Sequence, residues 1–355
     1  MENNLEILNS ITDIEPSIPV SRAITMQEKQ KLTANLSNAR SENTRKNYMG
    51  AWNRFVQWCE SESVNPLPVE PWVVALYIQK LTDDGFKEST LTTALSAIQA
   101  MHSDNGHTDN GHTGSFFTHR LVKSTLTASK RKMANDGRSV VSKPAVFSEQ
   151  LMKDMLALCS NMLSGIRDKA MLALGFNTGM RASEISSLIP SDIVFDDHGM
   201  TVNIRRSKGD QFGKGESFYI QALAPIHSDV CAVHNMKRWL EARAGVEAVL
   251  RVDTPIFFAL RKGANPYPYT DSNGVIHPMT RQAISKIVAG YAGRLSISGN
   301  YSAHSLRHSF ITLAFSKGVS GNRIAKVSRH KNLRVLQGYD RTSMKDNSFN
   351  LALWE

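Results

Sequence analysis

A basic, turn-rich stretch at residues 130–143 divides this chain of 355 residues into two segments. It includes the run Asn135-Asp136-Gly137, which favours a turn, and Pro144 follows directly after it. A chain of this length exceeds what one hydrophobic core usually organises. We therefore predict two domains joined by a basic linker at 133–146.

The N-terminal segment has the periodicity of helices. After a polar, acidic tail at 1–40, which we expect to be partly disordered, Ser41 is placed to cap a helix. The aromatic and sulfur residues that share one face of this helix are Tyr48, Trp52, Phe55 and Cys59. Prolines then interrupt the pattern, and helical spacing returns at 72–81 and 89–101. Residues 41–132 are predicted to form an all-helical domain.

The C-terminal segment, 147–355, combines helical spacing with one hairpin pattern. Helices are predicted at 151–162 and 166–177, and helical spacing resumes after about residue 280. Between them, Val202 and Ile204 alternate with polar residues before a Gly-rich turn and a second short run of strand formers. The predicted fold class is mainly α, with a small β-sheet or hairpin in the C-terminal domain.

The composition is that of a globular protein. Apolar residues make up 41% of the chain, aromatic residues 8% and charged residues 21%, which excludes wholesale disorder and fibrous repeats. No apolar run approaches the roughly 20 residues of a membrane-spanning helix, and the N-terminus lacks the pattern of a secretory signal. Three separated cysteines, Cys59, Cys159 and Cys231, suit the core of a protein in a reducing compartment. We therefore expect a cytoplasmic location.

The net charge of +10 favours a polyanionic partner. Residues 1–143 carry 16 basic and 15 acidic side chains, whereas 144–355 carry 26 and 17, so the second segment holds nearly all the excess. Nucleic acid and an acidic membrane surface would both attract this charge. Because no basic amphipathic helix with an exposed aromatic face stands out, nucleic acid is favoured and no membrane contact is expected.

Several familiar catalytic signatures are missing from the chain. It has no phosphate-binding G-x-x-x-x-G-K-[ST] loop, no H-E-x-x-H and no G-x-S-x-G. A tandem Asp-Asn-Gly-His-Thr repeat places His107 and His112 where they could hold a metal, but no cluster at recognisable spacing offers the remaining ligands. A solvated loop is the simpler interpretation, and we assign no metal site.

What remains is a set of cationic groups around one tyrosine. Each has an ordinary alternative, such as a surface ion pair for Arg181 and Glu184 or a solvated loop for Lys208. His304 and Arg307 are three residues apart, so a helix would place them on one face. The last pair, His330 and Tyr339, lies in a basic stretch, which suggests nearby phosphates. The full set is Arg181, Glu184, Lys208, His304, Arg307, His330 and Tyr339.

In this order and with these local spacings, the residues resemble the tyrosine recombinase family, also called phage integrases. The match covers roughly 147–355, and the helical region 41–132 resembles the core-binding domain that precedes it in these two-domain enzymes. The stretch with Trp58-Cys59 and Pro68-x-x-Pro71 is most similar to the Cre-type branch. The chain departs from the family pattern at Arg329, where the family usually has Gly before the histidine.

The resemblance implies a site-specific DNA recombinase that works without metal, ATP or another cofactor. Tyr339 would attack the scissile phosphate to give a 3′-phosphotyrosine, and strand exchange and religation would follow through a Holliday junction. Arg181, Arg307 and His330 can stabilise the negative charge that gathers on the phosphate. The nearest candidate base is His304, the family assigns the general acid to Lys208, and Glu184 would orient Arg181.

The resemblance also implies double-stranded DNA as the partner, bound by a homotetramer on two target sites and therefore near the nucleoid. Candidate DNA contacts are Arg45, Lys46, Arg131, Lys132 and Arg281. The apolar residues of 348–355 would pack on a neighbouring subunit or on their own domain.

Two other functions remain open at this point. Enzymes with the same cleavage chemistry, such as a type IB topoisomerase or a telomere resolvase, would differ only in their products. A noncatalytic DNA-binding regulator derived from a recombinase would lack the reaction, but such decay has no reason to spare all six candidate catalytic residues.

Overall fold

The computed structural model describes residues 25, 27, 40–105, 115–138, 144–205, 215–245, 253–261, 268–330 and 332–339. The chain divides into two compact units, Met1–Ser142 and Lys143–Glu355. Both are mainly helical, and the strands of the described sheet belong to the second unit. The predicted fold class is confirmed. No helix within the described ranges is long and apolar enough to cross a membrane.

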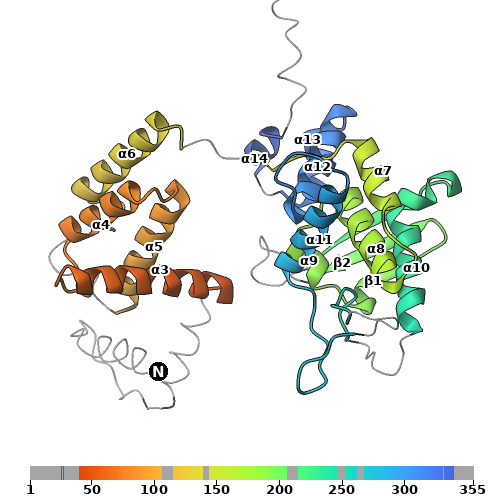
Figure 1. The fold of residues 1–355 in the computed structure, drawn as a ribbon, viewed down its shortest axis with the longest axis horizontal. Helices are drawn as coiled ribbons and strands as arrows, with labels where there is room; N and C mark the ends of the chain where they lie inside the picture. Colours follow the sequence, from red (N-terminus) through yellow and green to blue (C-terminus); the bar gives the residue numbers. More distant parts are fainter. Residues whose placement is uncertain are drawn as a thin grey trace, which may run out of the picture. The chain divides into compact units, whose positions relative to one another are not determined.

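The first unit contains four described helices of at least 13 residues (Figure 1). They are α3 (Glu42–Ser61), α4 (Pro71–Asp83), α5 (Glu88–Asp104) and α6 (Arg120–Asn135). The Ser41 side chain accepts from Thr44 N at 3.2 Å and so caps α3, while α4 begins at a proline, which lacks the amide hydrogen that the first turn leaves unpaired. Helix α6 continues into the first residues of the predicted linker.

The core of this unit grows from the aromatic face of α3. Trp52, Phe55 and Cys59 are buried, and the Phe55 ring lies 5.0 Å from the Tyr77 ring of α4 in an edge-on contact. Helix α3 packs on α5 and α4 packs on α6. The predicted apolar face therefore joins the helices of the unit, because it is buried against α4 and α5 rather than exposed.

The second unit is built around α8 (Leu163–Thr178), which has 11 of its 16 residues buried and packs against α7 (Glu149–Ala157), α10 (Ala232–Ala244) and α12 (Ala303–Ser316) (Figure 1). The helix predicted over 151–162 ends early, at Ala157, because the chain turns sharply before α8 begins. The turn brings Ser160 so close to α8 that a Cβ atom on Gly165 would lie 2.2 Å from Ser160 O. The remaining helical elements are α9 (Ala182–Ser186), α11 (Arg281–Arg294), α13 (Gly321–Ser328), α14 (Leu333–Gln337), η1 (Pro190–Asp192) and η2 (Pro225–Val230).

The predicted hairpin is present as part of a three-stranded antiparallel sheet. Strands β2 (Gly199–Ile204) and β3 (Glu216–Gln221) pair with Val202 opposite Phe218. The third strand, β1 (Ile193–Phe195), pairs with the other edge of β2 and was not predicted, because three residues are too short to show an alternating pattern. The loop that joins β2 to β3 and carries Lys208 lies outside the described residues.

Candidate active site

Arg181 stands at the junction of two helices of the second unit. Helix α8 is capped by Gly179, which adopts a left-handed conformation (φ +61°) and passes so close to α12 that a Cβ atom would lie 2.7 Å from the Phe310 ring. The chain then reverses, and Arg181 becomes the cap of the short helix α9. The sharp turn is therefore what brings Arg181 alongside α12.

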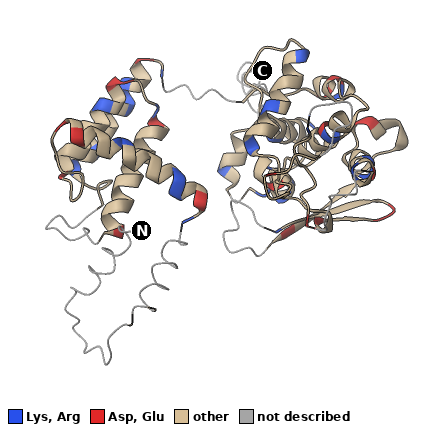
Figure 2. Ribbon diagram, turned by 60° about the horizontal axis from the view of Figure 1, so that its bottom comes forward, with Lys and Arg blue, Asp and Glu red and all other residues tan. Residues whose placement is uncertain are grey.

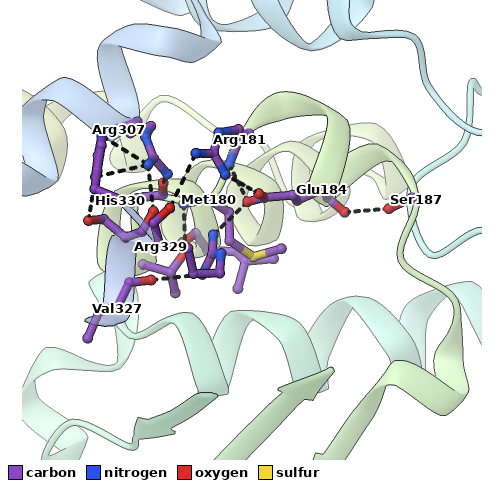
Figure 3. Close-up of polar contacts among 12 residues, drawn as sticks. Met180, Arg181, Glu184, Ser187, Arg307, Val327, Arg329 and His330 are labelled. Atoms are coloured by element: carbon purple, nitrogen blue, oxygen red, sulfur yellow. Dashed lines mark hydrogen bonds and ion pairs between the residues drawn. The ribbon is translucent and has the colours of Figure 1, made fainter. Parts of the chain in front are cut away.

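Glu184, one turn along α9, holds Arg181 in place. Arg181 Nη1 donates to Glu184 Oε1 at 2.6 Å, and the Arg181 amide donates to Glu184 Oε2 at 2.8 Å (Figure 3). The Glu184 side chain is only 1% exposed, whereas that of Arg181 is 24% exposed. The carboxylate is thus a buried anchor, and the guanidinium reaches from it toward the surface.

Arg307 lies on α12 and is buried. Its Nη1 donates to Gly179 O at 2.6 Å and its Nη2 donates to Ser328 O at 2.5 Å, so the guanidinium joins the end of α8 to the end of α13 (Figure 3). Burial, followed by the nearby Arg181, lowers the pKa of Arg307 to about 10. The guanidinium therefore remains positively charged at neutral pH.

His330 follows α13 and contacts the same guanidinium. Arg307 Nη2 lies 3.1 Å from His330 Nδ1 and 3.2 Å from Nε2, and the Ser328 hydroxyl lies 2.7 Å from Nδ1. Burial, then Arg307 and Arg181, lowers the pKa of His330 to about 4. The ring is therefore neutral at pH 7, and one of its nitrogens retains a hydrogen to donate.

Tyr339 lies just beyond α14, beside the histidines of α12. Its ring centroid is 4.3 Å from that of His308 and 5.9 Å from that of His330, and His308 in turn lies 4.6 Å from His304. Burial raises the pKa of Tyr339, while Arg307 and Arg181 oppose the shift. Partial desolvation, then Arg307 and Arg181, lowers the pKa of His304, so this exposed imidazole is neutral at pH 7.

The structure thus brings five of the predicted catalytic residues and Glu184 into one connected region of the second unit. Lys208 lies outside the described residues, as do His107 and His112 of the tandem repeat. Within the described part of the chain, no group of three or more His, Cys, Asp or Glu side chains is arranged to hold a metal ion.

Two residues at the site were missed when the sequence was interpreted. His308, whose ring contacts that of Tyr339, is four residues after His304, and that helical step is the signal that could have revealed it. Arg329 was noticed only as a departure from the family pattern. Its side chain turns inward and pairs with Glu184 Oε2 at 2.5 Å (Figure 3).

The five candidate DNA contacts are all exposed. Arg45 and Lys46 lie on α3, and Lys46 pairs with Glu42 at 2.7 Å. Arg131 and Lys132 lie on α6, where they help to line an open hollow of about 740 Å³ together with Arg120 and Lys123. Arg281 is the first residue of α11 in the second unit.

Comparisons with known proteins identify the family and the relatives of this chain. The model of the phage integrase family matches residues 145–346, more than half of the chain. An integrase/recombinase xerD homolog from Selenomonas ruminantium is 27% identical over 90% of this chain and 88% of its own length. Tyrosine recombinase XerD from Chlorobaculum tepidum is 27% identical over 86% of this chain and 89% of its own length.

One solved structure of similar fold is the XerH site-specific recombinase bound to its difH substrate in a pre-cleavage complex. It has a TM-score of 0.56 and 16% sequence identity, and the alignment covers 99% of this chain and 95% of that chain. The two proteins therefore share their fold along nearly the whole length of both chains.

Proposed function

This chain belongs to the phage integrase family of tyrosine recombinases, and from this premise we propose that Tyr339 cleaves and rejoins DNA at specific sites. The observation that carries the proposal is the convergence of Arg181, Arg307, His330 and Tyr339, which come from separate elements of the second unit. In this proposal, residues 41–132 are a core-binding domain, 133–146 a linker and 147–355 the catalytic domain.

The first role of the site is to hold a phosphodiester and stabilise its transition state. Nucleophilic attack adds negative charge to the nonbridging oxygens, and two guanidinium groups with an imidazole N–H are suited to receive it. Arg307 is held rigidly by two backbone carbonyls, and Arg181 is held by Glu184, so little reorganisation is needed when the phosphate binds.

The covalent step exchanges one phosphate ester for another. Tyr339 Oη bonds to phosphorus as the bond to the 5′ oxygen breaks, and this leaves a 3′-phosphotyrosine and a free 5′ hydroxyl. The tyrosine proton passes to a base, for which the neutral imidazole of His304 is the candidate, and Lys208 supplies a proton to the leaving oxygen. Because the ester bond is conserved, a 5′ hydroxyl from another strand can reverse the step without ATP.

The groups around Tyr339 also affect how readily it loses its proton. Its ring makes a tilted contact with that of His308, and the positive charge of Arg307 and Arg181 favours the phenolate that burial disfavours. A bound phosphate would bring further negative charge, so the proton must leave as the bond to phosphorus forms. His304, on the same helical face as His308, is positioned to accept it directly or through water.

The finer features of the proposal concern assembly and DNA binding. We propose a Cre-like enzyme that acts as a homotetramer on two double-stranded DNA sites in the cytoplasm, at the nucleoid. Contact with phosphates is supported by exposed cations on three helices: Arg45 on α3, Arg131 on α6 and Arg281 on α11. Light scattering of the protein bound to DNA would count the subunits.

The test is to trap the covalent intermediate. Purified protein is incubated with supercoiled DNA from its native locus in EDTA, quenched with detergent and examined for a protein–DNA adduct. We expect an adduct with the wild type and at least about a thousandfold less with Tyr339→Phe, which keeps the ring but removes the nucleophile. The variant should still bind DNA.

The products then distinguish the related enzymes. Exchange of strands between two sites supports the recombinase, whereas relaxation alone indicates a topoisomerase and closed hairpin ends indicate a telomere resolvase. Salt-sensitive DNA binding without any adduct, on DNA that contains the cleavage site, would contradict the proposal and favour a noncatalytic regulator.

A further inference from the structure

Arg329 combines two features that each cost stability. It is the C-cap of α13 in the left-handed conformation (φ 57°, ψ 47°), which disfavours residues with a Cβ atom. Its side chain is also only 5% exposed, so a positive charge is buried there. Among the described residues, Arg329 Nε has no hydrogen-bond partner. A residue kept at this position needs a compensating interaction.

The compensation comes from three directions. Arg329 Nη2 pairs with Glu184 of α9 at 2.5 Å, and Nη1 donates to Val327 O of its own turn at 2.8 Å. The guanidinium also lies 4.8 Å from the centre of the Phe218 ring on β3, in a cation–π contact. Arg329 therefore ties α9, α13 and β3 together at the base of the site.

Glu184 is consequently shared between two arginines. Oε1 accepts from Arg181 Nη1, whereas Oε2 accepts from both the Arg181 amide and Arg329 Nη2 (Figure 3). With both carboxylate oxygens occupied, the plane of the carboxylate is fixed, and so is the direction in which Arg181 leaves it. Because Glu184 also pairs with Arg329, its negative charge offsets less of the positive charge of Arg181 than it would in a pair of these two residues alone.

The backbone of Arg329 acts on the same groups. Its carbonyl accepts from Arg181 Nη2 at 3.4 Å, and its left-handed conformation ends α13 so that the next amide, that of His330, donates to Ala325 O at 3.1 Å. One residue thus touches Arg181 through its main chain and through Glu184, and it sets the turn from which His330 projects.

We propose that Arg329 is a positioning residue that sets the orientation of Arg181 and His330 for attack on the phosphate. This inference rests on the proposed cleavage reaction. A glycine would adopt the same turn with less strain but would leave Glu184 bound to Arg181 alone. The arginine therefore strains the backbone of this turn, but it fixes the carboxylate that anchors Arg181.

Cleavage kinetics provide the first test. The single-turnover rate of adduct formation is measured at saturating concentrations of the DNA duplex mapped by the trapping experiment. We expect Arg329→Met and Arg329→Gly to lower the rate by about tenfold or more, because small displacements of a catalytic group carry large penalties, without weakening DNA binding. Arg329→Lys, which can still pair with Glu184, should recover part of the rate.

A matched control separates position from charge. Arg323 is an exposed arginine on the same helix, and Arg323→Met removes the same charge without touching Glu184. It should cleave at the wild-type rate. Because Arg329→Gly relieves the left-handed turn, this variant is expected to fold even if Arg329→Met does not, and circular dichroism checks both.

The second test follows Glu184 itself and needs no DNA. Burial acts to raise the pKa of Glu184, and Arg329 and then Arg181 counter it, so the net pKa lies below the ordinary value. In protein labelled with ¹³C at the glutamate carboxyl carbons, with Glu184→Gln used for assignment, the pKa should rise in Arg329→Met and return toward the wild-type value in Arg329→Lys.

The outcomes separate this inference from the proposed function. Wild-type cleavage with an unchanged rate in Arg329→Gly, or an unchanged Glu184 titration in Arg329→Met, would overturn the positioning role. A rate loss that only follows weaker DNA binding would overturn it as well. If the wild type forms no adduct, the proposed function fails together with any role in cleavage, while the titration still decides whether Arg329 holds Glu184.

Discussion

The ion pairs described in the first unit are at least partly exposed, whereas the second unit has buried ones as well. In the first unit, several basic side chains pair at the surface with acidic partners, as Lys46 does with Glu42 and Lys132 with Asp83. Figure 2 shows both signs of charge along these helices. In the second unit, Arg181 and Arg329 share one buried carboxylate, and Arg307 is buried against backbone carbonyls.

The difference shows that exposed and buried charges contribute unequally to stability. Exposed pairs contribute little because water and salt screen them, so a lysine there can be replaced at low cost. Burying a guanidinium group costs desolvation free energy, which the contacts of Arg307 and Arg329 with carbonyls, Glu184 and Phe218 offset. Around Glu184, three arginines therefore face one carboxylate, and this local excess of positive charge is consistent with the proposed phosphate site.

The largest effect that would sharpen this comparison is expected at Arg307. Arg307→Met would leave two buried carbonyls, Gly179 O and Ser328 O, without their donor, and we expect a loss of about 3 kcal/mol in the free energy of unfolding. Arg181→Met should cost much less, because Glu184 keeps Arg329 as its partner. Denaturant unfolding of both variants measures the difference.

Both substitutions should nevertheless lower adduct formation by about 100-fold or more, since each removes a donor to the phosphate. Equal losses of stability in Arg307→Met and Arg181→Met would contradict the distinction between a buried structural cation and an anchored, partly exposed one. The adduct assay is performed well below the unfolding temperature of the less stable variant.

A smaller effect is expected in the pH dependence of stability. The pKa of His330 is about 4 in the folded protein, whereas an unperturbed histidine has a pKa near 6.5. Between these values the unfolded chain binds more protons, so stability should fall as the pH decreases from about 6.5 to 4, with a slope of at most about 1.4 kcal/mol per pH unit from this residue. The contribution is fully present above pH 6.5.

His330→Gln removes this titration while keeping a polar side chain. Unfolding free energies measured at several pH values should show a shallower decline for His330→Gln than for the wild type in that window. If the stability of the two proteins changed with pH in parallel, the pKa of His330 would be the same in the folded and unfolded chains. Burial in the second unit would then have no effect on this titration.

The smallest effect is expected in the helical unit. Lys132→Met breaks the exposed pair with Asp83, and we expect the thermal midpoint to move by less than about 2 °C, with no dependence on added salt beyond that of the wild type. Calorimetry with Asp83→Asn and the double variant isolates the pair. A large coupling energy between Lys132 and Asp83 would contradict the comparison, because an exposed pair would then contribute substantially to stability.

Local patterns predicted much of the fold. The aromatic spacing that begins at Tyr48 marked α3 and its buried face, and the alternation at Val202 and Ile204 marked the hairpin, because both signals arise from neighbours along the chain. The end of α7 and strand β1 were missed. Each depends on a few residues and on contacts with distant elements, which periodicity does not encode.

The contacts of the candidate site were likewise predictable only where they join neighbours along the chain. The pair of Arg181 and Glu184 could be predicted because one helical turn joins them. The contact between Arg329 and Glu184 spans 145 residues of sequence, and it also requires a non-glycine residue in a left-handed turn, which propensity argues against. The contact between the rings of His308 and Tyr339 likewise depends on where α14 packs.

The two carbonyls that hold Arg307 belong to the C-terminal ends of α8 and α13. The C-terminal end of a helix carries partial negative charge from its aligned peptide dipoles, so both helices direct their negative ends at this guanidinium. A counter-charge made of peptide groups cannot be protonated, and no side-chain substitution removes it. Acid therefore acts on the anchor of Arg181 directly, by protonating Glu184, whereas the peptide groups that hold Arg307 do not titrate.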